Sequence, residues 1–188
     1  SDVYKRQILA VGMKQRGQLK DDTLVATVMS NLGLKLAMQR EGIAVEETAV
    51  GDRYVLEALN RSGFSLGGEQ SGHIVVPAHA TTGDGTLSGL LLMARMAETG
   101  KTLAELAQVM QVLPQQLINV PVSDKSAILK DPEVIAAKEA AEAELGDQGR
   151  VLLRASGTEE IFRVMVEASD EKHAREVAGR LAAVVAAV

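Results

Sequence analysis

The sequence has 188 residues, 46% of them hydrophobic and 2% aromatic, with a formal net charge of −5 at pH 7 and no cysteine. Scarce aromatic rings and scattered basic residues argue against nucleic-acid binding, which uses base stacking or a positive patch, and against binding to an anionic membrane. Disulfides and thiolate chemistry are excluded, and no apolar run approaches the roughly eighteen residues of a membrane span. We therefore expect a cytoplasmic protein of one large or two small domains that binds neither nucleic acid nor membrane.

The opening of the chain has no clear pattern. Residues 1–7 fit neither a helix nor a strand, and residues 8–13 form a short apolar run of uncertain type. Because the interpretable sequence begins so abruptly at residue 8, we expect the chain to be a piece of a longer protein. Residues 1–7 form a separate N-terminal segment in this interpretation.

Residues 8–113 predict alternating strands and helices. Residues 24–29 predict a buried strand and residues 43–50 a second strand, and each is followed by apolar residues at helical spacing that end at a glycine. A third strand begins at residues 64–66. Since strands that alternate with helices indicate parallel pairing and right-handed crossovers, we expect an α/β domain with a mixed, largely parallel sheet.

Two loops of this domain are expected to be neighbours. The turn at residues 51–53 follows the second strand, and the glycine-rich segment at residues 67–73 follows the third. In open α/β sheets, ligands bind at the carboxyl ends of the strands, where both loops would lie. A later helix is predicted to bury Leu87, Leu90, Leu91 and Ala94.

Residues 114–188 predict a smaller α+β domain. Residues 114–116, Pro-Gln-Gln, break the preceding pattern and are the candidate linker. Beyond them the predicted order is strand, helix, strand, strand, helix, with the first helix over residues 132–145 and the paired strands at residues 151–153 and 161–166. This order indicates helices on one face of a sheet.

The polar turn between those paired strands offers groups that suit a phosphate. It presents the side chains of Arg154, Ser156 and Thr158, a Gly157 that can adopt backbone angles other residues avoid, and Arg163 just inside the next strand. An arginine can donate two hydrogen bonds to one phosphate, and the N–H groups of a turn can point at an anion. The alternative is an ordinary solvated turn flanked by surface arginines.

The glycine-rich segment offers groups that suit a sugar. If residues 69–73 are extended, the side chains of Glu69, Ser71 and His73 share one face, where a carboxylate and a hydroxyl can bind vicinal hydroxyl groups. In the alternative interpretation, the glycines form a bend and Glu69 is solvated.

The residues alone reveal no catalyst and no metal site. His73 and His79 lack a third ligand with suitable spacing, and Asp84 between two glycines is better explained as a helix cap. Ser156 has no His or Lys near it in the sequence to activate it as a nucleophile. The sequence therefore predicts binding groups rather than catalytic ones.

Three separated motifs resemble loops of the α-D-phosphohexomutases. They are Gly-Glu-Gln-Ser-Gly-His at residues 68–73, Arg-Ala-Ser-Gly-Thr-Glu at residues 154–159 and Arg-Val-Met-Val-Glu at residues 163–167. Three further segments are most similar to the bacterial phosphoglucosamine mutases within that family, at residues 50–55, 82–85 and 149–154. The resemblance covers nearly all of the chain from residue 8 onward, with one departure at Glu160, where family members often carry proline.

The resemblance implies that the chain holds the third and fourth of four domains around a cleft. The missing first two domains, its implied partners, carry the phosphoserine and the aspartate-rich loop that binds Mg²⁺. The implied reaction is an isomerase reaction in cell-wall precursor synthesis, which interconverts glucosamine 6-phosphate and glucosamine 1-phosphate through a bisphosphate. Since no catalytic residue or metal ligand falls in this part, we expect the fragment alone to be inactive.

The resemblance also implies two sets of substrate-binding residues. Those for the phosphate are Arg154, Ser156, Gly157, Thr158 and Arg163. Those for the sugar are Glu69, Ser71 and His73, with Gly51, Asp52 and Arg53 bordering the same cleft.

Two alternatives remain open at this stage. A phosphomannomutase or phosphoglucomutase specificity would use the same loops. A non-catalytic module that binds a phosphosugar would be complete as it stands.

Overall fold

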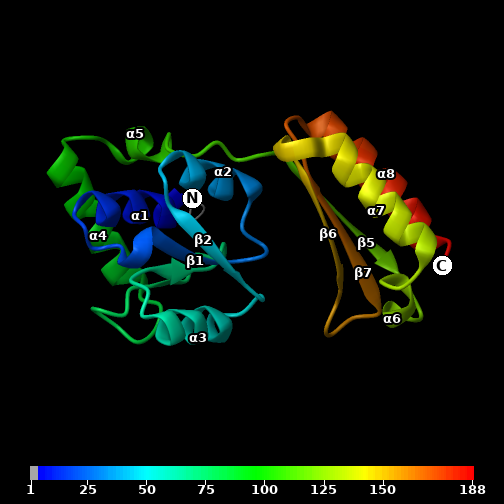
Figure 1. The fold of residues 1–188 in the computed structure, drawn as a ribbon, viewed down its shortest axis with the longest axis horizontal. Coiled ribbons are helices and arrows are strands. Elements are labelled where there is room, and N and C mark those ends of the chain that lie inside the picture. The colour runs from blue at the N-terminus through cyan, green and yellow to red at the C-terminus, as the bar shows by residue number, and fades with distance from the viewer. Residues whose placement is uncertain (1–3) are drawn as a thin grey trace. The chain divides into compact units, whose positions relative to one another are not determined.

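The computed structural model of the chain describes residues 4–188 and divides into two compact units between Val112 and Leu113 (Figure 1). The elements of the first unit are, in chain order, α1 (Lys5–Gln15), η2 (Lys20–Asp22), β1 (Thr23–Thr27), α2 (Leu32–Arg40), β2 (Ala44–Thr48), α3 (Asp52–Ser62), β3 (Gly67–Gly68), β4 (Ile74–Val75), α4 (Gly85–Thr99) and α5 (Leu103–Ala107). The elements of the second unit are β5 (Gln115–Pro121), α6 (Lys125–Ile128), α7 (Pro132–Leu145), η3 (Gly146–Gln148), β6 (Arg150–Ala155), β7 (Ile161–Glu167) and α8 (Glu171–Ala186).

The first unit is built on a sheet with the strand order β2-β1-β3-β4. β1 pairs in parallel with β2 and with β3, whereas β3 and β4 form an antiparallel pair. Every residue of β1 is buried, as is typical of a central parallel strand that is covered on both faces. The predicted α/β fold with a mixed, largely parallel sheet is therefore confirmed.

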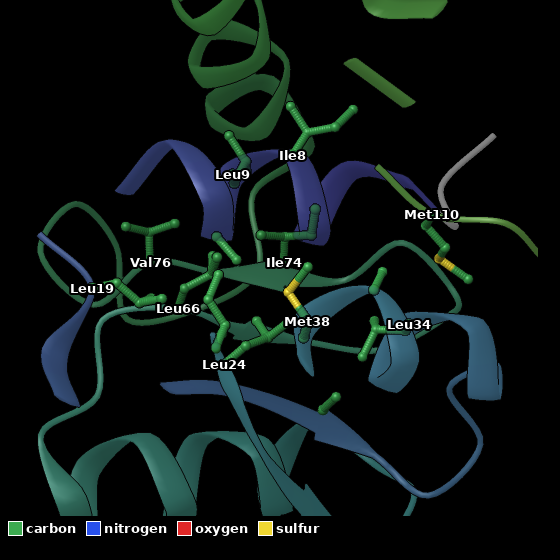
Figure 2. Close-up of a cluster of buried hydrophobic side chains, with 14 of the residues drawn as sticks. Ile8, Leu9, Leu19, Leu24, Leu34, Met38, Leu66, Ile74, Val76 and Met110 are labelled. Atoms are coloured by element: carbon green, nitrogen blue, oxygen red, sulfur yellow. The ribbon is translucent and has the colours of Figure 1, made fainter. Parts of the chain in front are cut away.

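The side chains of β1 alternate between two apolar layers. Leu24 and Ala26 lie in a cluster with residues of α1 and α2, and Figure 2 shows Leu24 there among Leu34, Met38 and Leu66. Val25 packs instead with residues of α3 on the opposite face of the sheet. Full burial of one aliphatic side chain contributes about 1.5–3 kcal/mol, so these layers fix the carboxyl end of β1 and the loops beside it.

Two expectations for the first unit are wrong. Residues 5–7, expected to fit no pattern, form the start of α1, while residues 1–3 lie outside the described part of the chain. On α4, the predicted Leu91 packs against the core cluster, but Leu90 is 55% exposed and Leu92, which was not predicted, is buried, so the predicted face is only partly the one that packs.

The second unit is an antiparallel sheet in the order β5-β7-β6, with α7 and α8 covering one face (Figure 1). Phe162, Val164 and Val166 of β7 form its core together with apolar side chains of both helices. The predicted α+β layer with helices on one face is confirmed, but Gln115 and Gln116 begin β5 and are not a linker. Among residues 4–188, no helix is long and apolar enough to cross a membrane.

Candidate functional site

The two loops at the carboxyl ends of β2 and β3 lie side by side, as predicted. The backbone N–H of Gly51 donates a hydrogen bond of 2.9 Å to Oε1 of Glu69. Gly51 precedes the first residue of α3 and has φ +131°, a value that favours glycine. The Glu69 carboxylate is therefore held near the positive end of α3 by a backbone donor, and it is not freely solvated.

The glycine-rich segment closes a hairpin rather than forming the extended strand that was considered. The backbone N–H of Glu69 donates to the carbonyl of His73 at 2.9 Å, and the N–H of Gly72 donates to the carbonyl of Glu69 at 3.2 Å. Gly72 has φ +97° at this bend. Because the segment bends, the side chains of Glu69, Ser71 and His73 do not share one face through the alternation of an extended strand. Ser71 and His73 are exposed.

A third loop lies against this hairpin. A Cβ atom added at Gly83 would lie 2.0 Å from Cδ2 of His73, so the imidazole ring rests directly on the backbone of Gly83. The next residue, Asp84, caps α4 by accepting a hydrogen bond of 2.9 Å from the N–H of Leu87, which confirms its predicted role as a cap. Residues from three loops thus meet around His73 and Glu69.

The two remaining candidates of the sugar set lie at the start of α3. Oδ1 of Asp52 accepts a hydrogen bond of 2.8 Å from the N–H of Arg53. The Arg53 side chain is 80% exposed and pairs with Glu57 one turn later at 2.7 Å. A hydrogen bond from Arg53 to Glu57 and the charge of Glu57 raise the pKa of Arg53, so the guanidinium stays charged beside the loops.

The candidate phosphate turn connects β6 to β7 in the second unit. The N–H of Ser156 donates to the carbonyl of Ile161 at 3.0 Å, and the N–H of Glu159 donates to the Ser156 hydroxyl at 3.3 Å. Ser156 is buried, whereas Gly157 and Thr158 are exposed at the tip. Gly157 does not have a positive φ, and no atom of the described residues outside its chain neighbours lies within 4 Å of a Cβ atom added there, so neither the expected unusual backbone angle nor packing within residues 4–188 requires glycine at this position.

Several donors of this turn have no protein partner. Within residues 4–188, no hydrogen bond satisfies the N–H groups of Gly157 and Thr158, the Thr158 hydroxyl or the guanidinium of Arg154. Arg163 lies directly opposite Arg154 across the two strands and pairs with Glu159 at 3.0 Å. The turn therefore presents neutral and charged donors together, an arrangement that can bind an anion.

Sequence reasoning missed three residues that surround these loops. Lys125 of α6 donates to the carbonyls of Ser156 and Glu159 at 2.7 and 3.0 Å. Asn119 of β5 lies opposite Arg163 on the other side of β7. Nη1 of the buried Arg6 donates to the carbonyl of Gly68 at 2.7 Å, and burial lowers the pKa of Arg6 to about 10. Only pairing and packing bring these residues to the loops, so no spacing in the sequence could have found them.

The chemistry of the described loops is that of binding. Within the part of the chain that the structure describes, no His, Lys or carboxylate side chain hydrogen-bonds to the hydroxyl of Ser156, which is the acceptor for Glu159. An unactivated hydroxyl is a weak nucleophile. The two loop systems can hold an anion and hydroxyl groups, and they contain no activated nucleophile.

Comparisons with known proteins give the family. The model of the phosphoglucomutase/phosphomannomutase α/β/α domain III matches residues 6–113, and the model of the C-terminal domain of phosphoglucomutase/phosphomannomutase matches residues 117–184. The chain belongs to the phosphoglucomutase/phosphomannomutase family. Residues 6 and 7, set apart in the sequence interpretation, fall inside the first match.

Curated relatives of this family are closely similar in sequence. The chain is 73% identical to the phosphoglucosamine mutase of Corynebacterium aurimucosum over 181 residues and 71% identical to that of Corynebacterium glutamicum. It is 65% identical to the phosphoglucosamine mutase of Kineococcus radiotolerans over 178 residues. These matches cover 95–96% of this chain but only 39–40% of the relatives, so the chain spans about two fifths of their length.

Solved structures share the fold of this chain. A structure of N-acetylphosphoglucosamine mutase from Aspergillus fumigatus has a TM-score of 0.80 at 22% identity and covers 100% of this chain and 43% of its own. Another structure of that enzyme, in complex with GlcNAc-6P and magnesium, has a TM-score of 0.79, also at 22% identity, and covers 98% of this chain and 46% of its own. In residues 4–188 of the present chain, no group of three or more His, Asp or Glu side chains could hold a metal ion.

Proposed function

We propose that the chain is the substrate-holding carboxy-terminal part of a phosphoglucosamine mutase. The whole enzyme would interconvert glucosamine 6-phosphate and glucosamine 1-phosphate through a bisphosphate, in the cytoplasm, as a step towards cell-wall precursors. Support comes from relatives of 65–73% identity that carry the name phosphoglucosamine mutase. The phosphoserine and the Mg²⁺ loop are assigned to the remaining three fifths of such a protein.

The phosphate group is assigned to the turn between β6 and β7. The observation that carries this assignment is the set of donors without a protein partner at Arg154, Gly157 and Thr158. Ser156 shapes the turn from inside by accepting the N–H of Glu159. Arg163 becomes a further donor when it exchanges Glu159 for the phosphate, because their ion pair is partly exposed and therefore weak.

The sugar ring is assigned to the loops of the first unit. Glu69 keeps one carboxylate oxygen on the N–H of Gly51, which leaves the other oxygen to accept from ring hydroxyl groups. Ser71 and His73 are exposed on the same hairpin, and Asp52 and Arg53 border it at the start of α3. Asp52 and Glu69 can accept hydrogen bonds from hydroxyl groups, Arg53 can donate to them, and Ser71 and a neutral His73 can do both.

Positioning of the substrate is the contribution that this part makes to phosphoryl transfer. Catalysis of such reactions depends chiefly on orientation and on electrostatic stabilisation of the phosphoryl group. Since the described loops contain no activated nucleophile, we expect the purified chain to bind the phosphosugar and to show no turnover. Measurable mutase activity of the chain alone would contradict this division of labour.

The proposal is tested by titrating the isotopically labelled chain with glucosamine 1,6-bisphosphate. We expect amide shifts at residues 69–73 and at residues 154–158, and loss of the second set in an Arg154→Ala variant. Arg175→Ala is the matched control, because Arg175 is an exposed arginine of α8 that pairs, among residues 4–188, with Glu171 alone, in its own helix. No shift at millimolar ligand would overturn the binding roles, whereas equal shifts with glucose 1,6-bisphosphate would favour a phosphoglucomutase specificity.

A further inference from the structure

Lys125 holds both ends of the turn between β6 and β7. Its Nζ atom donates a hydrogen bond of 2.7 Å to the carbonyl of Ser156 and one of 3.0 Å to the carbonyl of Glu159. The residue comes from a separate element, α6, more than thirty positions earlier in the chain. One ammonium group thus joins the first and the last residue of segment 156–159, which contains the unpartnered N–H groups of Gly157 and Thr158.

The fold fixes the position of Lys125 from three directions. The strand before it ends with Pro121 opposite Ile161, and the N–H of Val122 then donates to the carbonyl of Glu160 at 3.1 Å. Asp124 caps α6 by accepting hydrogen bonds from the N–H groups of the second and third helical residues. The last residue of α6, Ile128, is 1% exposed in the core of the unit.

The contact with Ser156 determines where the next N–H group points. A peptide unit is planar and trans, so the C=O of one residue and the N–H of the following residue point in opposite directions. Because the carbonyl of Ser156 is directed at the ammonium group, the N–H of Gly157 is directed away from Lys125. The same argument turns the N–H of Glu160 away when the carbonyl of Glu159 accepts from Lys125.

We propose that Lys125 is a positioning residue of the phosphate site, which holds the turn from behind so that the Gly157 N–H faces the anion. This inference rests on the proposed function, since it presumes that the turn binds the phosphate. It adds a residue outside the two binding motifs. Lys125 also places a positive charge behind the turn, where it favours an anion without contacting it.

The test measures the binding of glucosamine 6-phosphate to the unaltered chain and to three variants. Binding is followed through the NMR chemical shifts of the backbone amides. Lys125→Met removes the ammonium and is expected to raise the dissociation constant about tenfold, as loss of a charge-assisted contact typically does. Lys125→Arg keeps the charge and the donors and is expected to restore most of the affinity. Lys172→Met is the matched control, because Lys172 is an 84% exposed lysine of α8 whose nearest ion-pair partner is 3.8 Å away.

A readout without ligand separates positioning from general stability. In Lys125→Met we expect a shifted amide signal at Gly157 and faster hydrogen exchange of the Ser156 N–H, which donates to the carbonyl of Ile161, with unchanged exchange in α7 and α8. If the Met variant does not fold, Lys125→Gln replaces it, with the same direction of change expected. Unaltered phosphate affinity and an unaltered Gly157 signal in a folded Lys125 variant would overturn this inference and leave the proposed function standing. Absence of binding by the unaltered chain would overturn the phosphate assignment itself, and this inference with it.

Discussion

Arg154 of β6 and Arg163 of β7 are direct cross-strand partners, so their side chains leave the sheet on the same face. Like charges directly opposite each other on a sheet are destabilising. Glu159 compensates only one of them, through its 3.0 Å contact with Arg163. A bound dianion would relieve the repulsion between the two arginines. Anion binding therefore explains why two arginines face each other here, which a purely structural role does not.

Replacement of Arg154 by Ala should therefore abolish phosphate binding without lowering stability. Removing one of two facing charges is expected to leave the melting temperature unchanged or slightly higher. The corresponding gain in free energy of unfolding is at most about 1 kcal/mol. Thermal unfolding with and without 10 to 100 mM phosphate measures both effects, because a ligand that binds the folded state raises the melting temperature of the unaltered chain only. A melting temperature several degrees lower in the variant would contradict this.

Glu159→Gln should strengthen phosphate binding. The substitution releases Arg163 from its only carboxylate partner among the described residues and removes a negative charge beside the site. The loss in stability should stay within about 1 kcal/mol, since the pair is partly exposed. Isothermal titration with a sugar phosphate measures the change, with Glu171→Gln as the control because Glu171 pairs with Arg175 in the same i,i+4 manner on α8. Weaker binding by Glu159→Gln would show that Glu159 orders Arg163 rather than competing for it.

Local rules predicted much of this fold correctly. Gly63 ends α3 in the left-handed conformation, Asp131 caps α7, and the apolar run of β1 marks a central strand. These features depend on a few neighbouring residues, so the sequence contains the whole signal. Lys125 lacks such a signal, because its contacts with the turn depend on how β5 pairs with β7.

The packing face of α4 shows where periodicity fails. Leu87, Leu90, Leu91, Leu92 and Met93 give this helix apolar residues around much of its circumference. A helix of that kind offers no contrast between its faces, so spacing cannot tell which one packs on its neighbours. In the structure Leu92 is 6% exposed, while Leu90 and Met93 are 55% and 57% exposed.

Leucine-to-alanine substitutions on α4 should separate these faces. Leu92→Ala is expected to lower the free energy of unfolding by about 2–5 kcal/mol, because it leaves a cavity in a packed cluster. Leu90 lies two positions before Leu92 on α4 and is exposed. Leu90→Ala should therefore change the free energy of unfolding by less than about 0.5 kcal/mol, as is usual at the surface. Chemical denaturation of the two variants measures both values. Equal losses would mean that Leu90 is covered in solution.

Gly83→Ala should disturb the hairpin that is proposed to bind the sugar. The added methyl group would meet the His73 ring at 2.0 Å, so the imidazole must move. We expect large shifts of the ring signals of His73 and weaker glucosamine phosphate binding at residues 69–73. Gly85→Ala is the matched control, because no described residue outside its chain neighbours and its own helix backbone lies within 4 Å of a Cβ atom there. Unchanged His73 signals in Gly83→Ala would mean that the ring does not rest on this glycine.

Low pH should loosen the capped helix that presents Lys125. The Asp124 carboxylate accepts hydrogen bonds from the Ser126 hydroxyl and from the N–H groups of Ser126 and Ala127, which lower its pKa below the ordinary value. Because the folded pKa lies below the unfolded value of about 3.9, the cap contributes stability above that pH and loses it as the pH falls through the folded pKa. We expect the Asp124 carboxyl to titrate below about pH 3.9, with the Ser126 amide signal moving at the same midpoint. Asp124→Asn should keep a cap and remove this titration from the Ser126 signal. A midpoint at or above the ordinary value would mean that the carboxylate does not cap α6, and Lys125 would then lack one of the contacts that fix it behind the turn.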